Sequence, residues 1–115
     1  MSWEPAQRLL CTRYEATFTA SPETTNSGFA LGTQGLLPIN GLRHPAASGT
    51  TGWYLWCGET LSDAPDFFQP VHTLHIYEQY PEISELLGLP PGYRFLKSTE
   101  YLDIWFDANL LIETP

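Results

Sequence analysis

Residues 53–57 read Trp-Tyr-Leu-Trp-Cys, and a glycine stands on either side of them, at positions 52 and 58. All five residues are good strand formers, and the run is apolar enough to be covered on both faces. Glycine at each end favours a turn there. The stretch therefore predicts a buried strand of a sheet, and it is the strongest secondary-structure signal in the chain.

Two further strands are predicted near the carboxyl terminus, over residues 93–97 and 102–107. A Leu-Pro-Pro-Gly turn at residues 89–92 precedes the first, and Ser-Thr-Glu at residues 98–100 separates the two. So short a connection predicts antiparallel neighbours.

The last predicted strand alternates in character. Ile104 and Phe106 point to one side, whereas Asp103, Trp105 and Asp107 point to the other. The sheet is therefore expected to have one apolar face and one charged, aromatic face.

A helical pair is predicted over residues 70–88. Asp66 is placed to cap the first helix, Pro70 is tolerated in its first turn, and the helix is expected to stop near Tyr80. Pro81 restarts the second helix and Gly88 ends it.

The amino-terminal part is more broken. The alternation of Leu10, Tyr14, Ala16 and Phe18 favours a strand within residues 9–19. Two loops are expected at residues 20–28 and 44–52, with short extended pieces between them. Residues 1–28 add an edge strand, clasp a partner or stay mobile, and the sequence leaves these alternatives open.

At 115 residues and 43% hydrophobic composition, the chain predicts one folded domain. Residues 1–40 are expected to form a partly flexible amino-terminal region of a strand plus loops, and residues 41–115 the core of the same domain. The predicted fold class is α+β, with a mainly antiparallel sheet packed against the short helical pair in a single compact domain.

The net charge of −8 lies entirely in the second half. Residues 1–58 hold three glutamates and three arginines, whereas residues 59–115 hold ten carboxylates against Arg94 and Lys97. Nucleic acid and anionic membranes are poor partners for so few cations. Carboxylates set among large aromatic residues instead indicate a protein partner that carries positive charge.

The first ten residues have neither the basic flank nor the apolar run of a signal peptide, and no window is long enough to span a bilayer. A cytoplasmic location is expected. Cys11 and Cys57 are therefore expected to be buried, reduced thiols.

Several segments in order resemble a known family. They are Gly-Leu-Arg-His-Pro at 41–45, Gly-Trp-Tyr-Leu-Trp-Cys-Gly-Glu at 52–59, Asp-Phe-Phe-Gln-Pro-Val-His at 66–72, Leu-Gly-Leu-Pro-Pro-Gly-Tyr-Arg-Phe-Leu at 87–96 and Asp-Ile-Trp-Phe-Asp at 103–107. Together they resemble the bacterial immunity protein 33-like domain over roughly residues 41–112.

The resemblance implies a small protein, encoded beside a polymorphic toxin, that binds and silences this toxin inside the producing cell. It implies no catalytic residues and no cofactor. The partner-binding residues must therefore come from the chemistry of the chain, and Trp105 is the preferred anchor because Asp103 and Asp107 flank it on one strand face. A second group of acidic residues is expected in loops beside the strands: Glu59, Asp63, Asp66 and Glu100.

Two other classes of function remain open. His72 and His75, with Glu59, are the candidate ligands of a small metal-dependent hydrolase, although two histidines three apart are a weak metal signal. A module that binds a small ligand such as a sugar, through tryptophan and carboxylates, is the other alternative. No serine stands in a nucleophile elbow, and a non-enzymatic protein is expected.

Overall fold

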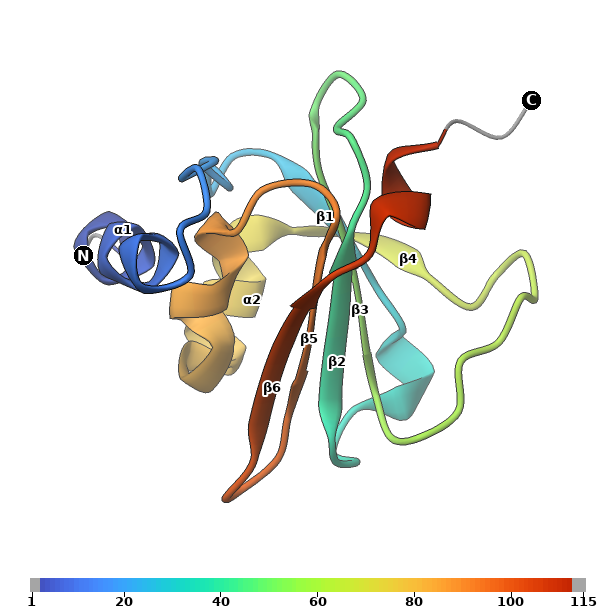
Figure 1. The fold of residues 1–115 in the computed structure, drawn as a ribbon. Helices are drawn as coiled ribbons and strands as arrows, with labels where there is room; N and C mark the ends of the chain where they lie inside the picture. Colours follow the sequence, from blue (N-terminus) through green and yellow to red (C-terminus); the bar gives the residue numbers. More distant parts are fainter. Residues whose placement is uncertain (1–2, 113–115) are drawn as a thin grey trace.

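The Trp-Tyr-Leu-Trp-Cys run lies in β3 (Thr50–Cys57), an interior strand of a six-stranded sheet (Figure 1). The structure is a computed structural model that describes residues 3–112. The other strands are β1 (Asn26–Phe29), β2 (Ile39–Arg43), β4 (Gln69–His72), β5 (Tyr93–Lys97) and β6 (Leu102–Phe106).

The strand order is β4-β1-β3-β2-β5-β6. All neighbouring pairs are antiparallel except β1 and β3, which run parallel. The predicted strands at 93–97 and 102–107 pair as antiparallel neighbours, as expected. The predicted α+β class with a mainly antiparallel sheet is thus confirmed, and the one parallel pair makes the sheet mixed.

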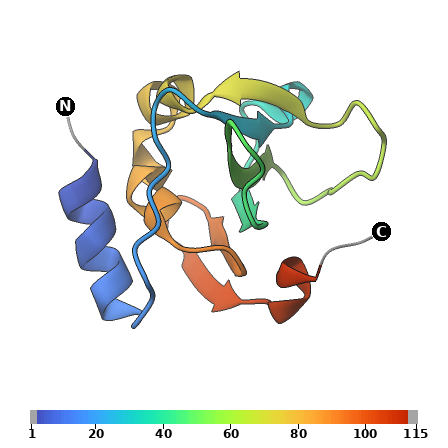
Figure 2. The ribbon, with the colours of Figure 1, turned by 90° about the horizontal axis from the view of Figure 1, so that it is seen from above.

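The helices cover one face of the sheet, which we call the inner face. On it lie α1 (Glu4–Arg13), α2 (Thr73–Gln79) and the 3₁₀ helix η2 (Pro81–Gly88) (Figures 1 and 2). The opposite, outer face is covered in part by the loop of residues 58–68 and by the short η3 (Ala108–Leu111). A single turn, η1 (Leu31–Thr33), follows β1. None of the helices in residues 3–112 has the length and hydropathy required to cross a bilayer.

The main hydrophobic core lies between the inner face and the helices. From β3 and β5 the side chains of Trp53, Leu55 and Phe95 point into it and are almost wholly buried. The helical pair contributes Ile83, Leu86 and Leu87, which are equally buried. All three belong to the same core cluster as Trp53 and Leu55.

A buried arginine ties this core to the loops around it. Arg43, at the end of β2, is 1% exposed, and no carboxylate pairs with it among the described residues. Its guanidinium instead donates to the backbone carbonyls of Thr19, Ala20, Thr51, Leu87 and Leu89. Burial lowers the pKa of Arg43 to about 10, so the side chain stays cationic at neutral pH.

Both cysteines are buried and free, as predicted. The Cys11 thiol lies 3.3 Å from the Gly88 carbonyl oxygen and joins α1 to the end of η2. Burial raises the pKa of both thiols, which keeps them protonated at neutral pH.

The predicted strand within residues 9–19 is wrong, because a helix, α1, occupies residues 4–13. The true signal is the spacing of Gln7, Leu10 and Cys11, which are buried together on one side of the helix. Pro5 in the first turn and Arg13 in the last are both favourable there. The alternation that suggested a strand belongs to the segment after the helix, where Phe18 packs against the core in an extended loop.

The predicted start of the helical pair is also wrong. Asp66 caps no helix but lies in a turn, and Pro70 lies in β4, whose register pairs it with Gly28 of β1. Proline is tolerated there because β4 is an edge strand. The first helix therefore begins at Thr73, and it ends before Tyr80 as predicted.

The two predicted loops are shorter than expected. Part of residues 20–28 forms β1, and β3 already begins at Thr50 inside the predicted loop 44–52. Ser27 of β1 is held in a buried hydroxyl cluster, in which its Oγ lies 2.6 Å from Thr51 Oγ1 and 2.9 Å from Thr73 Oγ1. This long-range pairing outweighs the local turn preference of Asn-Ser-Gly.

Candidate functional site

A row of four side chains crosses the outer face of the sheet. The strand registers place Tyr54 opposite Leu42, Leu42 opposite Arg94, and Arg94 opposite Trp105. Residues in direct register point to the same side, so the row joins the interior strands to the edge strand β6. The next row along contains Trp56, Asn40, Leu96 and Asp103.

An aromatic cluster lies at the interior end of this row. The Phe68 ring contacts Tyr54 and Trp56 edge-on, with ring centroids 5.2 and 6.2 Å apart, and Phe67 packs against Phe68 at 4.8 Å. His44 packs edge-on against Tyr54 at 5.6 Å, and its Nδ1 lies 3.2 Å from the Leu110 carbonyl oxygen of η3. The loop 58–68 and η3 are thus held against the outer face by aromatic contacts.

Between the loop and the sheet lies an open groove of about 760 Å³, which we call the outer groove. The sheet side of the groove is mainly apolar and aromatic, whereas the loop side is largely polar and carries one carboxylate, that of Asp63. The lining residues are Leu42, His44, Tyr54, Thr60, Leu61, Ser62, Asp63 and Phe68.

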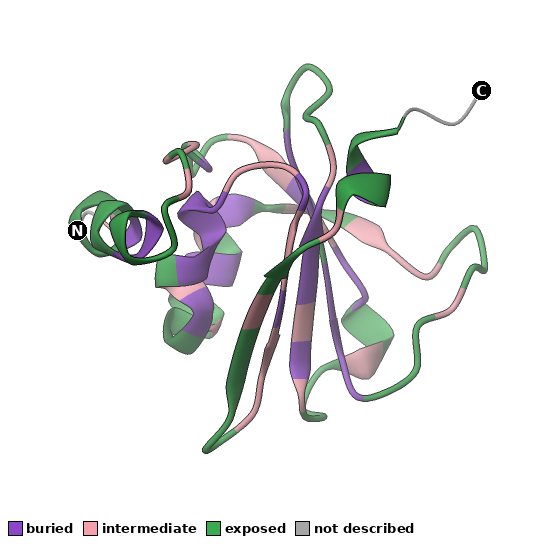
Figure 3. Cartoon of the chain, viewed as in Figure 1, coloured by how far each residue is buried: buried purple, intermediate pink, exposed green. Residues whose placement is uncertain are grey.

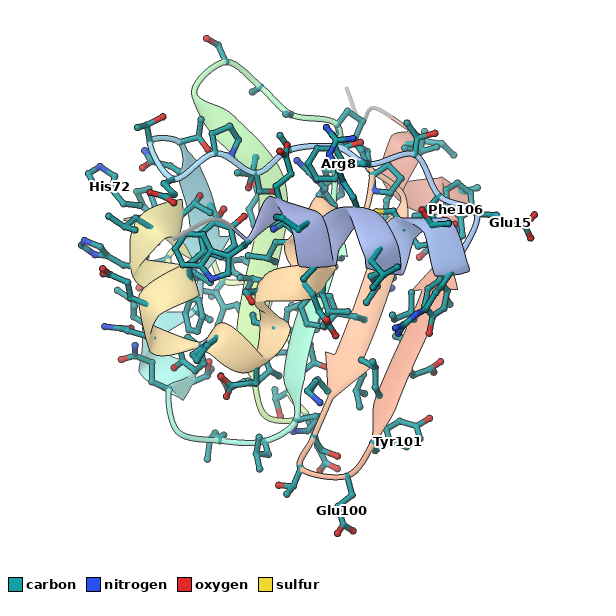
Figure 4. All side chains as sticks on the ribbon, turned by 90° about the vertical axis from the view of Figure 1, so that its left-hand side faces the viewer. Arg8, Glu15, His72, Glu100, Tyr101 and Phe106 are labelled. Carbon is teal, nitrogen blue, oxygen red and sulfur yellow. The ribbon has the colours of Figure 1, made fainter. Side chains whose placement is uncertain are left out.

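Most of the predicted partner-binding residues lie on the outer side of the molecule, either on the loop 58–68 or on β6. Glu59, Asp63 and Asp66 are exposed on the loop 58–68, which borders the outer groove. Asp103 is exposed on the outer face of β6. Glu100 lies apart from the groove, at the tip of the β5–β6 turn (Figure 4).

Trp105 and Asp107 are less free than the sequence suggested. The Arg94 guanidinium lies 5.4 Å from the centre of the Trp105 ring and pairs with Asp107 Oδ2 at 3.2 Å. Asp107 Oδ1 also accepts a hydrogen bond from the Asn109 backbone N–H and caps η3. Trp105 is 37% exposed, so one part of its ring meets solvent and another meets Arg94.

The sequence anticipated the two sides of β6 but not the outer groove. Ile104 packs against the main core, and Asp103 and Trp105 lie on the outer face, as predicted. The aromatic floor of the groove was missed because Tyr54 sits within a run of strand formers in which every residue looks buried. The available signal was that alternation places Tyr54 on the opposite face from Trp53 and Leu55.

The candidate metal ligands do not form a cluster. His72 and His75 are in ring contact at 5.7 Å beside a shallow pocket between η1 and the β4–α2 junction. That pocket is lined by Leu31, Gln34, Pro70, Val71, His72, His75 and Gln79, without a carboxylate. Over residues 3–112, no three His, Cys, Asp or Glu side chains are placed to hold a metal ion together. The geometry therefore gives no support to a metal-dependent hydrolase.

A family model for the Imm33-like domain matches residues 6–107. The chain belongs to the Imm33-like family. No curated protein and no solved structure matches it. The matched range of this Imm33-like domain begins in α1 and ends after β6, so it is longer than the resemblance over residues 41–112 and includes the amino-terminal helix.

Proposed function

We propose that this Imm33-like domain is an immunity protein that binds a cognate bacterial toxin and neutralises it by stoichiometric occlusion. Family membership supports an immunity role. Binding alone is sufficient for such a role, and the proposal requires no chemistry by this chain and no cofactor.

The observation that carries the proposal is the character of the outer face. Exposed carboxylates lie on the loop 58–68, which borders an open, aromatic groove, and on the outer side of β6. The helices α1, α2 and η2 pack on the other side of the sheet (Figure 2). The aromatic floor stands on interior strands of the sheet, so little side-chain freedom is lost when a partner binds there.

The proposed mechanism separates the two parts of this surface. Carboxylates at Asp63, Asp66 and Asp103 speed the encounter with a basic toxin surface. Tyr54 and Phe68 in the groove, with Trp105 on β6, provide apolar contacts that slow dissociation. Many nuclease toxins are basic because they bind phosphate backbones, and an acidic inhibitor competes with that ligand by charge.

The proposal places the protein in the cytoplasm of the producing cell, with the toxin encoded by an adjacent gene. The first experiment is to co-express the two proteins and purify them through a tag on one. We expect a complex of equal stoichiometry in which toxin activity is lost.

A charge-reversal pair then tests the surface. Replacing Asp63, Asp66 and Asp103 by Lys should slow association at least about 10-fold at low salt and flatten its dependence on ionic strength. The matched control replaces Glu23, Glu78 and Glu85, which are exposed on the helical side, and changes the net charge equally. Equal association rates for the two triple variants would contradict the proposed surface.

A further inference from the structure

The two edges of the sheet differ in how well they are protected. The edge strand β4 has four residues and contains Pro70, which has no N–H to offer a further strand. The other edge strand, β6, has five residues, and neither proline nor lysine lies within it. Unpaired edges of this second kind are templates for pairing with another chain.

The hydrogen-bond pattern of the β5–β6 hairpin shows which groups of β6 face outward. Ser98 N–H donates to the Tyr101 carbonyl at 2.8 Å, and Asp107 N–H donates to the Gly92 carbonyl at 2.7 Å. Because the pattern alternates, the odd-numbered residues of β6 bond to β5. The backbone N–H and C=O groups of Leu102, Ile104 and Phe106 therefore point toward the open edge.

The side chains along this edge are unusually apolar for a surface strand. Tyr101 is 56% exposed, Leu102 39% and Phe106 51%. Figure 3 shows β6 as largely exposed, and Figure 4 shows Tyr101 and Phe106 at its two ends. A partner strand would cover both the backbone groups and these side chains.

We propose that the β6 edge binds the β6 edge of a second copy of this chain, antiparallel, with the two-fold axis at Ile104. This register forms about six backbone hydrogen bonds, all from residues whose groups already face outward. It places Leu102 opposite Phe106 of the second copy, and Asp103 opposite Trp105 of the second copy.

Charge selects this register over its neighbours. An axis at Asp103 would oppose two identical carboxylates, and an axis at Trp105 would oppose Asp103 to Asp107 of the second copy. Like charges directly opposite each other destabilise a strand pair. Only the axis at Ile104 pairs the whole strand without such a clash, so the edge is complementary to itself.

The consequence is a continuous sheet across two copies. The two-fold axis of an antiparallel strand pair is perpendicular to the sheet, so both outer faces lie on the same side. Asp103 of each copy would lie beside Trp105 of the other, and the two outer grooves would open in one direction.

Sedimentation velocity over a concentration series tests the proposal on the whole protein. The interface is at the small end of specific interfaces, so we expect a dimer with a dissociation constant on the order of micromolar. A wild-type protein that stays monomeric up to about 0.5 mM would overturn the proposal.

A charge-swap pair tests the register. In L102D/F106D the introduced carboxylates oppose each other across the axis, and the dissociation constant should rise at least about 10-fold. In L102D/F106K the introduced groups are complementary in the same register, and dimerisation should return to within about 10-fold of wild type. Circular dichroism and thermal unfolding check that both variants fold.

Equal behaviour of the two charge variants, whether both dimeric or both monomeric, would exclude the register at Ile104. A disulfide cross-link provides an independent readout. In D103C/W105C, the cysteine at position 103 of each copy lies opposite the cysteine at position 105 of the other copy. Oxidation should give a covalent dimer, since within one chain these two positions are separated along an extended strand and do not reach each other. Failure to cross-link would contradict the geometry.

Discussion

The two faces of the sheet are built on opposite principles. The inner face is closed by helices over the interior strands and buries its side chains there almost completely, including the charged Arg43, and it opens only at β6, where Leu102 and Phe106 are exposed. The outer face has a small core of Ala30, Leu42, Trp56 and Leu110, and a loop and one short helix cover it only in part. The inner face thus supplies most of the stability, and the outer face is the surface that we propose for toxin binding.

The two arginines of the sheet illustrate the same difference. Arg43 is satisfied by five backbone carbonyls in the interior, where it joins separate loops. Arg94 is partly exposed and shares its guanidinium between Asp107 and the Trp105 ring. One cation therefore supports the fold, and the other shapes the proposed binding surface.

The largest effect is expected from removing the buried cation. Arg43→Ala would leave several carbonyls without a donor and a cavity beside Trp53, and should lower the free energy of unfolding by about 3–5 kcal/mol. Arg94→Ala, on the outer face, should cost about 1 kcal/mol or less. Urea unfolding of the two variants measures both free energies. Equal losses of stability in the two variants would contradict the difference proposed between the two faces.

Adjacent residues of β3 should show the same contrast between the two faces. Leu55→Ala should lower the free energy of unfolding by about 2–5 kcal/mol, because Leu55 lies wholly in the main core. Tyr54→Ala, on the outer face, should cost about 1 kcal/mol. The order should reverse for toxin binding, in which Tyr54→Ala loses at least about 10-fold in affinity and folded Leu55→Ala little. If Leu55→Ala lost more toxin affinity than Tyr54→Ala, as it should lose more stability, the division between the two faces would be contradicted.

A smaller effect separates two carboxylates of the outer strand. Asp107→Asn should lower the free energy of unfolding by about 1 kcal/mol, because it weakens both the ion pair with Arg94 and the cap of η3. Asp103→Asn should leave stability nearly unchanged and slow toxin association. If Asp103→Asn proved the more destabilising in thermal unfolding, the roles assigned to the two residues would be reversed.

Alkaline pH should destabilise the protein through the buried thiols and phenols of the inner face. Burial raises the pKa of Cys11, Cys57, Tyr77 and Tyr80 above their ordinary values of 9.0 and 10.0. The unfolded chain then releases protons at lower pH than the folded one, so stability is full below pH 9 and falls as pH rises through the folded-state pKa values. Urea midpoints between pH 7 and pH 10 measure the fall. The fall in stability should be smaller in Cys57→Ala, which lacks one of these groups. A rise in stability between pH 7 and pH 10 would contradict the raised pKa values.

Local patterns predicted those parts of the molecule whose partners lie near in sequence. The run at 53–57, the β5–β6 hairpin and the pair of helices around Pro81 all follow from strand formers, turn residues and proline positions. Residues 9–19 misled because helical spacing from Gln7 to Cys11 overlaps an alternating stretch that ends at Phe18. Pattern alone does not show which of two periods tertiary packing will use.

The parts that were missed depend on contacts across the chain. β1 and β4 contain Ser-Gly and Gln-Pro, which are poor strand sequences, and they form strands because they pair with each other and because β1 also pairs with β3. The outer groove likewise requires the loop 58–68 to return Phe68 onto Tyr54. Charge patterning located the acidic residues of the second half but not the ion pair that occupies Asp107.

Hydrogen–deuterium exchange of the toxin complex shows whether toxin binds the outer face or the helical side of the molecule. We expect toxin to slow exchange in residues 58–68 and in β6, and to leave exchange in α1 and α2 unchanged. Protection confined to α1 and α2, with the outer face exchanging as in the free protein, would contradict this expectation.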